Sequence, residues 1–563
     1  MFQLKIVLAL TMVFVSIFGS AASFAQPSPA PKLVVVLVVD QMRADYVDRY
    51  GQQWSRGLKR LVTEGAWFRR SAFPYLNTFT CAGHATVSTG ALPARHGMVG
   101  NSWYDRAAGA SVGCTQDAGV SLVSYAGPAK GGNSASRLLV PTLADELRTQ
   151  LASPAKVATF SLKERTAITL AGRKADAVTW FDLSARGFVT SSAYTDRPVP
   201  FLAEFVKANP VEADFDKAWE RLLPEASYLF ADGGTGEKPG KYWSREFPHP
   251  IRIGDGRNAE SYDAWETSPY SDTYLGRLGQ ATIDALKLGR GPGTDYLGIS
   301  FSALDLVGHD FGPTSHEVQD LLIRLDGTIG QLLDHLDRQV GKGQYVVALT
   351  ADHGVAPIPE QVRAMDLDAG RIDTAAVIKA ASEALRSSLG YAPPAPRLAN
   401  SDLYLDPAVV GYLRESPSAL GSVLRALRAV PGVANAYFAE SLVAHAAAGD
   451  TDAQAALASY HPARSGDIIV IAKPYHFYVR DDGTAQPGSA TTHGSLYDYD
   501  RRVPLVFYGS GIRPGEYLQK ATPADIAPTL AFLCGITLPR PDGEVLVDAI
   551  APRVLVPARA LRR

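Results

Sequence analysis

The feature that most constrains the fold is a set of apolar, β-branched runs, each followed closely by an acidic residue. These runs cover residues 33–39, 297–303 and 345–350. The acidic residues that follow them are Asp40, Asp305 and Asp352, the last with His353 beside it. A run that is apolar on both faces is typical of a strand buried in a parallel sheet. Ligands bind beyond the carboxyl ends of such strands, so these side chains are predicted to share one site.

The segments between the runs have helical patterns. A helix-like stretch covers residues 44–64, and an amphipathic one covers residues 316–339. Near the C-terminus, residues 503–508 are strand-like, and the sequence from Thr522 to Asp525 has the pattern of a helix start. This alternation predicts an α/β fold, with a central, mostly parallel sheet flanked by helices.

Two long stretches interrupt the alternation. Residues 171–290 are rich in aromatic residues, proline and glycine, and residues 365–485 combine alanine-rich helices with short strands. We expect both to be inserted cap segments that roof the site. The catalytic core would then consist of residues 26–170, 291–364 and 486–563. The chain has 563 residues, of which 46% are hydrophobic, and this is enough for a large core.

The first 25 residues have the pattern of a signal peptide. Lys5 supplies the positive start, residues 6–18 form an apolar run, and residues 23–25 form a small-x-small cleavage site. Cleavage after Ala25 would leave a periplasmic or extracellular protein with no membrane attachment. The alternative is an uncleaved anchor, which so short an apolar run disfavours.

Charge and cysteine content narrow the class of protein further. The net charge is −2 and there is no run of Lys or Arg, so a nucleic-acid partner is not expected. The three cysteines, Cys81, Cys114 and Cys534, can form at most one intramolecular disulfide. Disulfides therefore do not build this fold, and both the pairing and the oligomeric state are left open.

Four short pieces of the chain carry ligands that suit a zinc hydrolase. Such enzymes bind the metal through histidine nitrogen and carboxylate oxygen. The pieces are Asp40, Asp305-x-x-x-His309, Asp352-His353-Gly354 and His493-Gly494. Each piece alone is a weak signal, and the prediction of a metal site depends on their joint occurrence. Because these ligands also admit other divalent ions, they do not by themselves select zinc.

The stretch around Thr80 is a candidate for the reacting group. A threonine that opens a helix lies where free N–H groups and the positive end of the helix dipole face an anionic substrate. Contact with a metal ion would lower the pKa of its hydroxyl. The alternative is that Thr80 only caps the helix. Thr78, Cys81 and Thr86 are the rival nucleophiles in the same stretch.

Together these motifs resemble the alkaline phosphatase superfamily, and in particular its PafA-type branch with a threonine nucleophile. Nucleotide pyrophosphatase/phosphodiesterases are similar at a greater distance. The resemblance covers residues 33–530 and implies two zinc sites. Their implied ligands are Asp40, Thr80, Asp352 and His353 for one zinc, and Asp305, His309 and His493 for the other. Additional calcium sites are left open.

The same resemblance bears on the rival groups. Phosphoryl transfer in this superfamily uses an oxygen nucleophile, which favours Thr80 and leaves Cys81 as a donor of a backbone N–H. Sulfatases of the superfamily carry Cys-x-Pro-x-Arg, whereas this chain has Cys81-Ala-Gly-His-Ala, without the Pro or the Arg. A sulfatase is therefore disfavoured.

A Lys-x-Arg pair in the chain indicates whether the substrate is a phosphate monoester or a diester. A monoester dianion carries one more negative charge than a diester, so its site needs further positive donors. Lys163 and Arg165 are two apart, and on an extended segment both would point the same way. The resemblance assigns the phosphoryl oxygens to this pair together with Asn101. The alternative is a solvated charged segment.

These observations lead to one expected function and two alternatives. We expect an alkaline phosphatase that hydrolyses small-molecule phosphate monoesters through a phosphothreonine at Thr80. The first alternative is a phosphodiesterase or nucleotide pyrophosphatase of the same superfamily. The second, from another class, is a catalytically inactive metal- or phosphate-binding protein.

Overall fold

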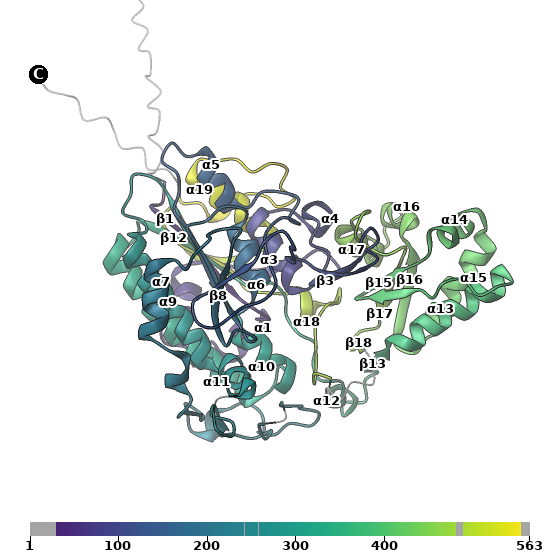
Figure 1. Ribbon diagram of the computed structural model, residues 1–563, viewed down its shortest axis with the longest axis horizontal. Coiled ribbons are helices and arrows are strands. Elements are labelled where there is room, and N and C mark those ends of the chain that lie inside the picture. The colour runs from purple at the N-terminus through teal and green to yellow at the C-terminus, as the bar shows by residue number, and fades with distance from the viewer. Residues whose placement is uncertain (1–29, 241, 257, 480–487, 553–563) are drawn as a thin grey trace, which may run out of the picture. The chain divides into compact units, whose positions relative to one another are not determined.

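The computed structural model describes residues 30–240, 242–256, 258–479 and 488–552 (Figure 1). The predicted signal peptide lies outside these residues. None of the helices in this described part of the chain combines the length and the apolar character that a bilayer crossing requires.

A ten-stranded sheet forms the centre of the fold. Its order is β20 (Gly515–Ala521), β2 (Ala66–Ser71), β19 (Leu505–Gly509), β12 (Tyr345–Thr350), β1 (Leu33–Val39), β11 (Asp295–Phe301), β6 (Val157–Ser161), β7 (Ala177–Asp182), β8 (Gly187–Ser191) and β5 (Leu122–Ser124). The five strands from β12 to β7 are parallel to one another. Antiparallel pairs join β19 to β12 and β8 to β7. The predicted α/β fold with a mostly parallel sheet is therefore confirmed.

Strand β1 is central and is buried on both faces. Its residues Val34, Val36 and Val38 enter one apolar cluster, and the residues between them enter another. The cluster around Val36 includes side chains of α3 (Thr80–Thr89), α5 (Leu143–Gln150), α6 (Glu164–Ala171) and α19 (Ile526–Cys534). The other includes side chains of α1 (Asp45–Tyr50), α2 (Gly57–Glu64), α9 (Pro269–Leu286) and α11 (His316–Leu336). Helices thus cover both faces of the sheet, as a parallel sheet requires.

The helix expected over residues 44–64 is two helices, α1 and α2, and the prediction of one continuous helix is wrong. The cause is Asp326 of α11, which is remote in sequence. Its Oδ2 accepts the N–H groups of Ser55 and Arg56, each at 2.8 Å, and its Oδ1 accepts that of Lys59 at 3.1 Å. These are donors at the start of α2 that lack partners within the helix, so Asp326 caps a new helix where the local pattern indicates continuation.

The two stretches predicted as cap segments contain different structures. Residues 171–290 contribute β7 and β8 to the central sheet before α7 (Pro200–Ala208), α8 (Ala259–Glu266) and α9. Residues 365–485 contain a separate four-stranded sheet, drawn in green in Figure 1. Its order is β14 (Arg397–Ala399), β15 (Asp402–Tyr404), β17 (Ile468–Ala472) and β16 (Val433–Phe438). The division into core and cap segments stays a prediction.

Replacing the carboxylate of Asp326 tests its role in starting α2. We expect Asp326→Ala to lower the free energy of unfolding by about 3 kcal/mol, because three N–H groups at the start of α2 lose a charged, buried acceptor. Urea unfolding followed by circular dichroism measures the change. Asp334→Ala is the matched control on the same helix. It removes an exposed pair with Arg56 and should cost less than about 0.5 kcal/mol. Equal losses in both variants would contradict the capping role.

Candidate metal centre and active site

Three acidic residues meet at the carboxyl edge of the parallel strands. Asp40 follows β1 directly, and Asp352 comes two residues after β12. The strand predicted over residues 297–303 ends two residues earlier than expected, and Asp305 does not lie on a loop at the strand end. Strand β11 ends at Phe301, and Asp305 lies in the first turn of α10 (Ala303–Phe311). Its x-x-x spacing to His309 is therefore one helical turn, which places both side chains on the same helix face.

The three predicted histidine ligands are oriented in the same way. The Nδ1–H of His309 donates to the carbonyl of Thr491 at 2.9 Å, and that of His493 donates to the carbonyl of Thr78 at 2.8 Å. The Nδ1–H of His353 donates to the carbonyl of Gly354 at 3.0 Å. A carbonyl can only accept, so each ring carries a proton on Nδ1, and in its neutral form Nε2 is the nitrogen free to bind a metal. This arrangement is the usual one for histidine ligands of metals.

The free Nε2 atoms face the carboxylates. Nε2 of His309 lies 3.3 Å from Asp305 Oδ1, and Nε2 of His493 lies 3.7 Å from the same oxygen. Nε2 of His353 lies 3.5 Å from Asp40 Oδ1 and 3.3 Å from Asp352 Oδ2. Two groups of three have all their ligand atoms within 4.8 Å of one another. They are Asp305 with His309 and His493, and Asp305 with Asp40 and His353.

Two buried carboxylate oxygens in this cluster lack a hydrogen bond. Asp40 Oδ1 and Asp352 Oδ2 receive none from the described residues. Nδ1 of His84 lies 3.1 Å from Asp352 Oδ2, but it donates to the carbonyl of Thr80 at 2.9 Å. A buried, unpaired carboxylate oxygen is costly, and a bound cation removes that cost. The orphaned oxygens, the oriented rings and the oxygen–nitrogen ligand set therefore fit divalent metal ions.

The pKa shifts of the acidic residues also fit a site for cations. Burial, with Asp305 and Asp352 close by, raises the pKa of Asp40 well above its usual range. Burial also opposes ionisation of Asp305, but Lys163 and His309 outweigh it and hold its pKa well below the usual range. Lys163 Nζ pairs with Asp40 Oδ2 at 2.6 Å and with Asp305 Oδ2. The carboxylates thus repel one another and are stabilised by nearby positive charge.

Thr80 lies at the start of α3, beside this cluster. The helix begins at Thr80 as predicted, and the capping position is occupied by Phe79, whose side chain makes no capping hydrogen bond. Thr80 Oγ1 lies 3.3 Å from Nε2 of His353. Its hydroxyl therefore faces a predicted metal ligand and does not cap the helix.

The rival groups in the same stretch are engaged elsewhere. Cys81 forms a disulfide with Cys114, and Cys534 is free and buried. The hydroxyl of Thr78 donates to the carbonyl of Ser495 at 2.9 Å, and that of Thr86 donates to the carbonyl of Ala82 at 2.9 Å.

The backbone N–H of Cys81 was expected to donate to the substrate, but it already has a partner within the protein. It donates to Oδ1 of Asn101 at 2.9 Å and is therefore not free for a phosphoryl oxygen. Through this hydrogen bond, the side chain of Asn101 is held beside Cys81, the residue that follows Thr80.

Lys163 and Arg165 lie together, but the expected extended segment is wrong. Lys163 occupies the capping position of α6, with φ −112° and ψ 137°, and Arg165 lies in the first helical turn. The chain turns into a helix between them, so strand alternation does not apply. Both residues line one cavity of about 370 Å³. Arg165 Nη1 is 3.5 Å from Glu164 Oε1, while its buried Nε has no hydrogen-bond partner among the described residues.

The sequence analysis did not identify two residues of the site, Gln41 and Gly83. Gln41 donates its backbone N–H to Asp352 Oδ1 at 3.1 Å and its Nε2–H to Asp305 Oδ1 at 2.6 Å, and so holds two of the acids. Gly83 lies where α3 crosses the Asp352 segment. A Cβ there would lie 2.2 Å from the carbonyl oxygen of Asp352. The available signals were a polar residue next to Asp40 and a glycine inside a helix.

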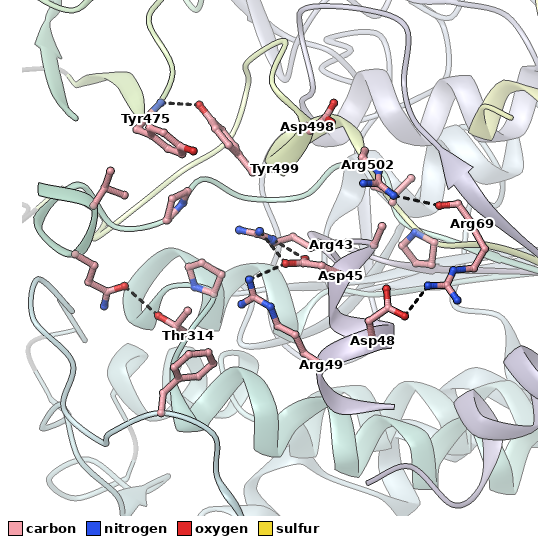
Figure 2. A pocket seen from close by; sticks show the side chains of 18 of the residues that line it. Arg43, Asp45, Asp48, Arg49, Arg69, Thr314, Tyr475, Asp498, Tyr499 and Arg502 are labelled. Carbon is pink, nitrogen blue, oxygen red and sulfur yellow. Dashed lines mark hydrogen bonds and ion pairs between the residues drawn. The ribbon is translucent and has the colours of Figure 1, made fainter. Parts of the chain in front are cut away.

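A different cavity, of about 580 Å³, lies away from the predicted residues. Figure 2 shows its lining, in which Arg43 and Arg49 both pair with Asp45, and Arg69 pairs with Asp48. It contains none of the ten predicted site residues.

The sheet and the site at its carboxyl edge are those of a hydrolase of α/β fold with a hydroxyl beside a candidate metal-binding cluster. The sequence profile of the type I phosphodiesterase / nucleotide pyrophosphatase family matches residues 34–496. The chain belongs to this family.

Relatives match over nearly the whole chain. Alkaline phosphatase PafA of Elizabethkingia meningoseptica is 32% identical over 520 residues, which cover 91% of this chain and 93% of that protein. A protein of Myroides odoratus named calcium-transporting ATPase is 32% identical over 539 residues, which cover 95% and 97%. The crystal structure of PafA matches with a TM-score of 0.84 and 31% identity, covering 93% of this chain and 100% of that one.

A solved variant of PafA carries substitutions of a threonine, an asparagine, a lysine and an arginine. Their spacing along that chain equals the spacing of Thr80, Asn101, Lys163 and Arg165 in this one.

The close approach at Gly83 yields a test of the site's construction. We expect Gly83→Ala to weaken metal binding by roughly tenfold, because its Cβ would push α3 away from Asp352. Metal content after dialysis against graded chelator, measured by elemental analysis, reports the change. Gly327→Ala is the matched control, since that helical position has open space around it. Unchanged metal binding in Gly83→Ala would show that this close approach does not position Asp352.

Proposed function

We propose that the chain is an alkaline phosphatase that hydrolyses small phosphate monoesters through a phosphothreonine at Thr80, at a site with two zinc ions. The observation that carries the proposal is the hydroxyl of Thr80, which lies at a helix start and 3.3 Å from Nε2 of His353. The relatives named alkaline phosphatase, which match over most of the chain, support it.

The residues divide naturally between two metal positions. Asp40, Asp352 and His353, with Thr80, would hold one ion, and Asp305, His309 and His493 would hold the other. Zinc bound there supplies Lewis acidity, which lowers the pKa of a contacting hydroxyl and stabilises negative charge on a leaving oxygen. Ligand atoms of Asp305 also lie within 4.8 Å of those of Asp40 and His353, so Asp305 connects the two positions.

The chain's own groups then carry out two successive displacements. The Thr80 oxygen gives up its proton and attacks phosphorus, a Thr80–phosphate bond forms, and the bond to the ester oxygen breaks as that oxygen takes up a proton and departs as the alcohol. Water next attacks the phosphothreonine, releases inorganic phosphate and restores the Thr80 hydroxyl. The start of α3 favours the anionic phosphoryl group throughout because its dipole end is positive. Positioning and electrostatic stabilisation supply most of the acceleration in such transfers.

Three further side chains favour a dianionic phosphoryl group. Lys163 and Arg165 place two cations in one cavity beside the acid cluster. Burial opposes their charging, but acidic neighbours outweigh it and raise the pKa of both groups, so both are cationic at neutral pH. Asn101 would donate its Nδ2–H groups, since its Oδ1 already accepts from Cys81. With metal ions bound to the acids, these positive donors would favour monoesters over diesters.

A phosphodiesterase or nucleotide pyrophosphatase is the second candidate, because the matched family carries that description. Its solved mammalian relatives share only the fold with this chain. Murine ectonucleotide pyrophosphatase / phosphodiesterase 5 matches with a TM-score of 0.52 at 12% identity. Turnover of an aryl phosphate monoester relative to the corresponding diester separates the candidates.

Export from the cytoplasm fits the same proposal. The Cys81–Cys114 disulfide is of the kind that persists in oxidising compartments. We therefore place the enzyme in the periplasm or outside the cell, where it would act on small phosphate esters and on no nucleic acid.

Removing the Thr80 hydroxyl tests the nucleophile. We expect Thr80→Ala to lower kcat for an aryl phosphate by at least about 10³-fold, because no other side chain can form the covalent intermediate. Elemental analysis should still find most of the bound metal. Thr89→Ala is the control, since its hydroxyl lies at the other end of α3 and donates to the carbonyl of Ala85. Full activity in Thr80→Ala would remove Thr80 from this role.

The paired cations yield a test of substrate class. We expect Lys163→Ala/Arg165→Ala to lower kcat/KM for a monoester by about 10³-fold or more, at 2–4 kcal/mol for each charged donor. The loss on a diester, which has less charge to stabilise, should be much smaller. Arg148→Ala, which removes the partly exposed pair with Asp176, is the control. Equal losses on both substrates would show that the pair does not recognise the extra charge.

A further inference from the structure

Asn101 lies in the sequence between Cys81 and Cys114, the two cysteines that form the disulfide. Cys81 is the second residue of α3, directly after Thr80, and Cys114 follows the hairpin of β3 (Ser102–Asp105) and β4 (Ala110–Gly113). The bond therefore ties the loop that carries Asn101 to the helix that carries Thr80. The two cysteines are 33 positions apart, and their Cα atoms are separated by 6.7 Å.

Each half-cystine also holds one oxygen of Asn101. The backbone N–H of Cys81 donates to the side-chain Oδ1 at 2.9 Å, and the backbone N–H of Cys114 donates to the main-chain carbonyl at 2.9 Å. The disulfide fixes the distance between these two donors. It thereby fixes both the backbone and the amide of Asn101 relative to Thr80.

Other hydrogen bonds to this loop hold residues on either side of Asn101 and not Asn101 itself. The carbonyl of Val99 accepts from Asn77, that of Ser102 accepts from Asn400, and that of Gly97 accepts from Arg464. Further along, Arg106 pairs with Asp467 at 3.0 Å. In the described part of the chain, the hydrogen bonds that Asn101 accepts come from the two half-cystines.

The disulfide is buried in a small apolar cluster of its own. Both cysteines are at most 1% exposed. The cluster contains Cys81, Ala85, Met98, Val99, Trp103, Val112, Cys114 and Leu138. It is separate from the two clusters that enclose the central sheet, so the disulfide supports the Asn101 loop rather than the main core.

We infer that the Cys81–Cys114 disulfide is a positioning device for Asn101, and that the affinity of the site for a phosphoryl dianion depends on this bond. The inference rests on the proposed function, in which Asn101 donates to a phosphoryl oxygen. Because Oδ1 accepts from Cys81, the amide plane is fixed beside Thr80 and its Nδ2–H groups are left to donate to the substrate. Without the disulfide, the hairpin can move away from α3, and the amide loses its fixed place.

A double-mutant cycle tests this directly. The variants are Cys81→Ala/Cys114→Ala, which keeps both backbone N–H groups, Asn101→Ala, and the triple variant. The readouts are kcat/KM for 4-nitrophenyl phosphate and the inhibition constant of inorganic phosphate. We expect loss of the disulfide to lower kcat/KM and to weaken phosphate binding by about tenfold or more. In the Asn101→Ala background the further loss should be under about twofold, because the group that the disulfide positions is already gone.

Two controls distinguish positioning from general stability. Cys534→Ala removes the free, buried cysteine, and Arg106→Ala removes a different anchor of the same loop. Both should retain kcat/KM within about twofold. A loss in Arg106→Ala equal to that of the disulfide variant, or equal disulfide losses with and without Asn101, would overturn the inference.

The outcomes also separate this inference from the proposed function. Full activity without the disulfide, with a loss in Asn101→Ala, overturns the positioning role alone. An unaffected Asn101→Ala overturns both the role of Asn101 and the inference. If the double variant fails to fold, folded wild-type enzyme is treated with a phosphine reductant and then reoxidised. Activity that falls on reduction and returns on reoxidation supports the inference, and activity unchanged by proven reduction overturns it.

Discussion

Mutual repulsion among three buried carboxylates is the constraint on which the site depends. Asp40, Asp305 and Asp352 are each at most 4% exposed, and parallel strands bring their segments to one edge. So much buried negative charge is tolerated only beside positive charge. Lys163 supplies part of it, and the oriented histidines supply the nitrogen ligands with which metal ions would supply the rest. The fold thus holds an arrangement that would be unstable without cations.

The groups around the acids act mainly by orientation. Backbone carbonyls fix the proton of each histidine on Nδ1, and Gln41 holds two of the carboxylates. Gly83 lets α3 approach Asp352 closely enough to bring Thr80 beside His353. On the far side of Thr80, the disulfide and Asn101 tie a loop to the same helix. The hydroxyl of Thr80, the proposed nucleophile, is therefore placed by contacts between α3 and distant parts of the chain.

Sequence alone predicts the parts of this structure that local patterns encode. Residues 33–39 and 345–350 form strands with the expected bounds, and the acids after them lie at one edge. The predictions that failed concern contacts between remote residues. Asp326 divides an expected helix because it caps a segment about 270 positions earlier, and Lys163 starts a helix where an extended segment was expected. Burial and packing of the whole chain decide these points, as they decide which cysteines pair.

The most direct test of the account is anomalous X-ray diffraction from crystals of the purified protein, recorded on both sides of the zinc absorption edge. The account predicts two strong peaks that appear only above the edge. One should lie among Asp40, Asp352, His353 and the Thr80 oxygen, and the other among Asp305, His309 and His493. Well-ordered side chains at these positions in zinc-replete crystals, with no peak between them, would contradict it.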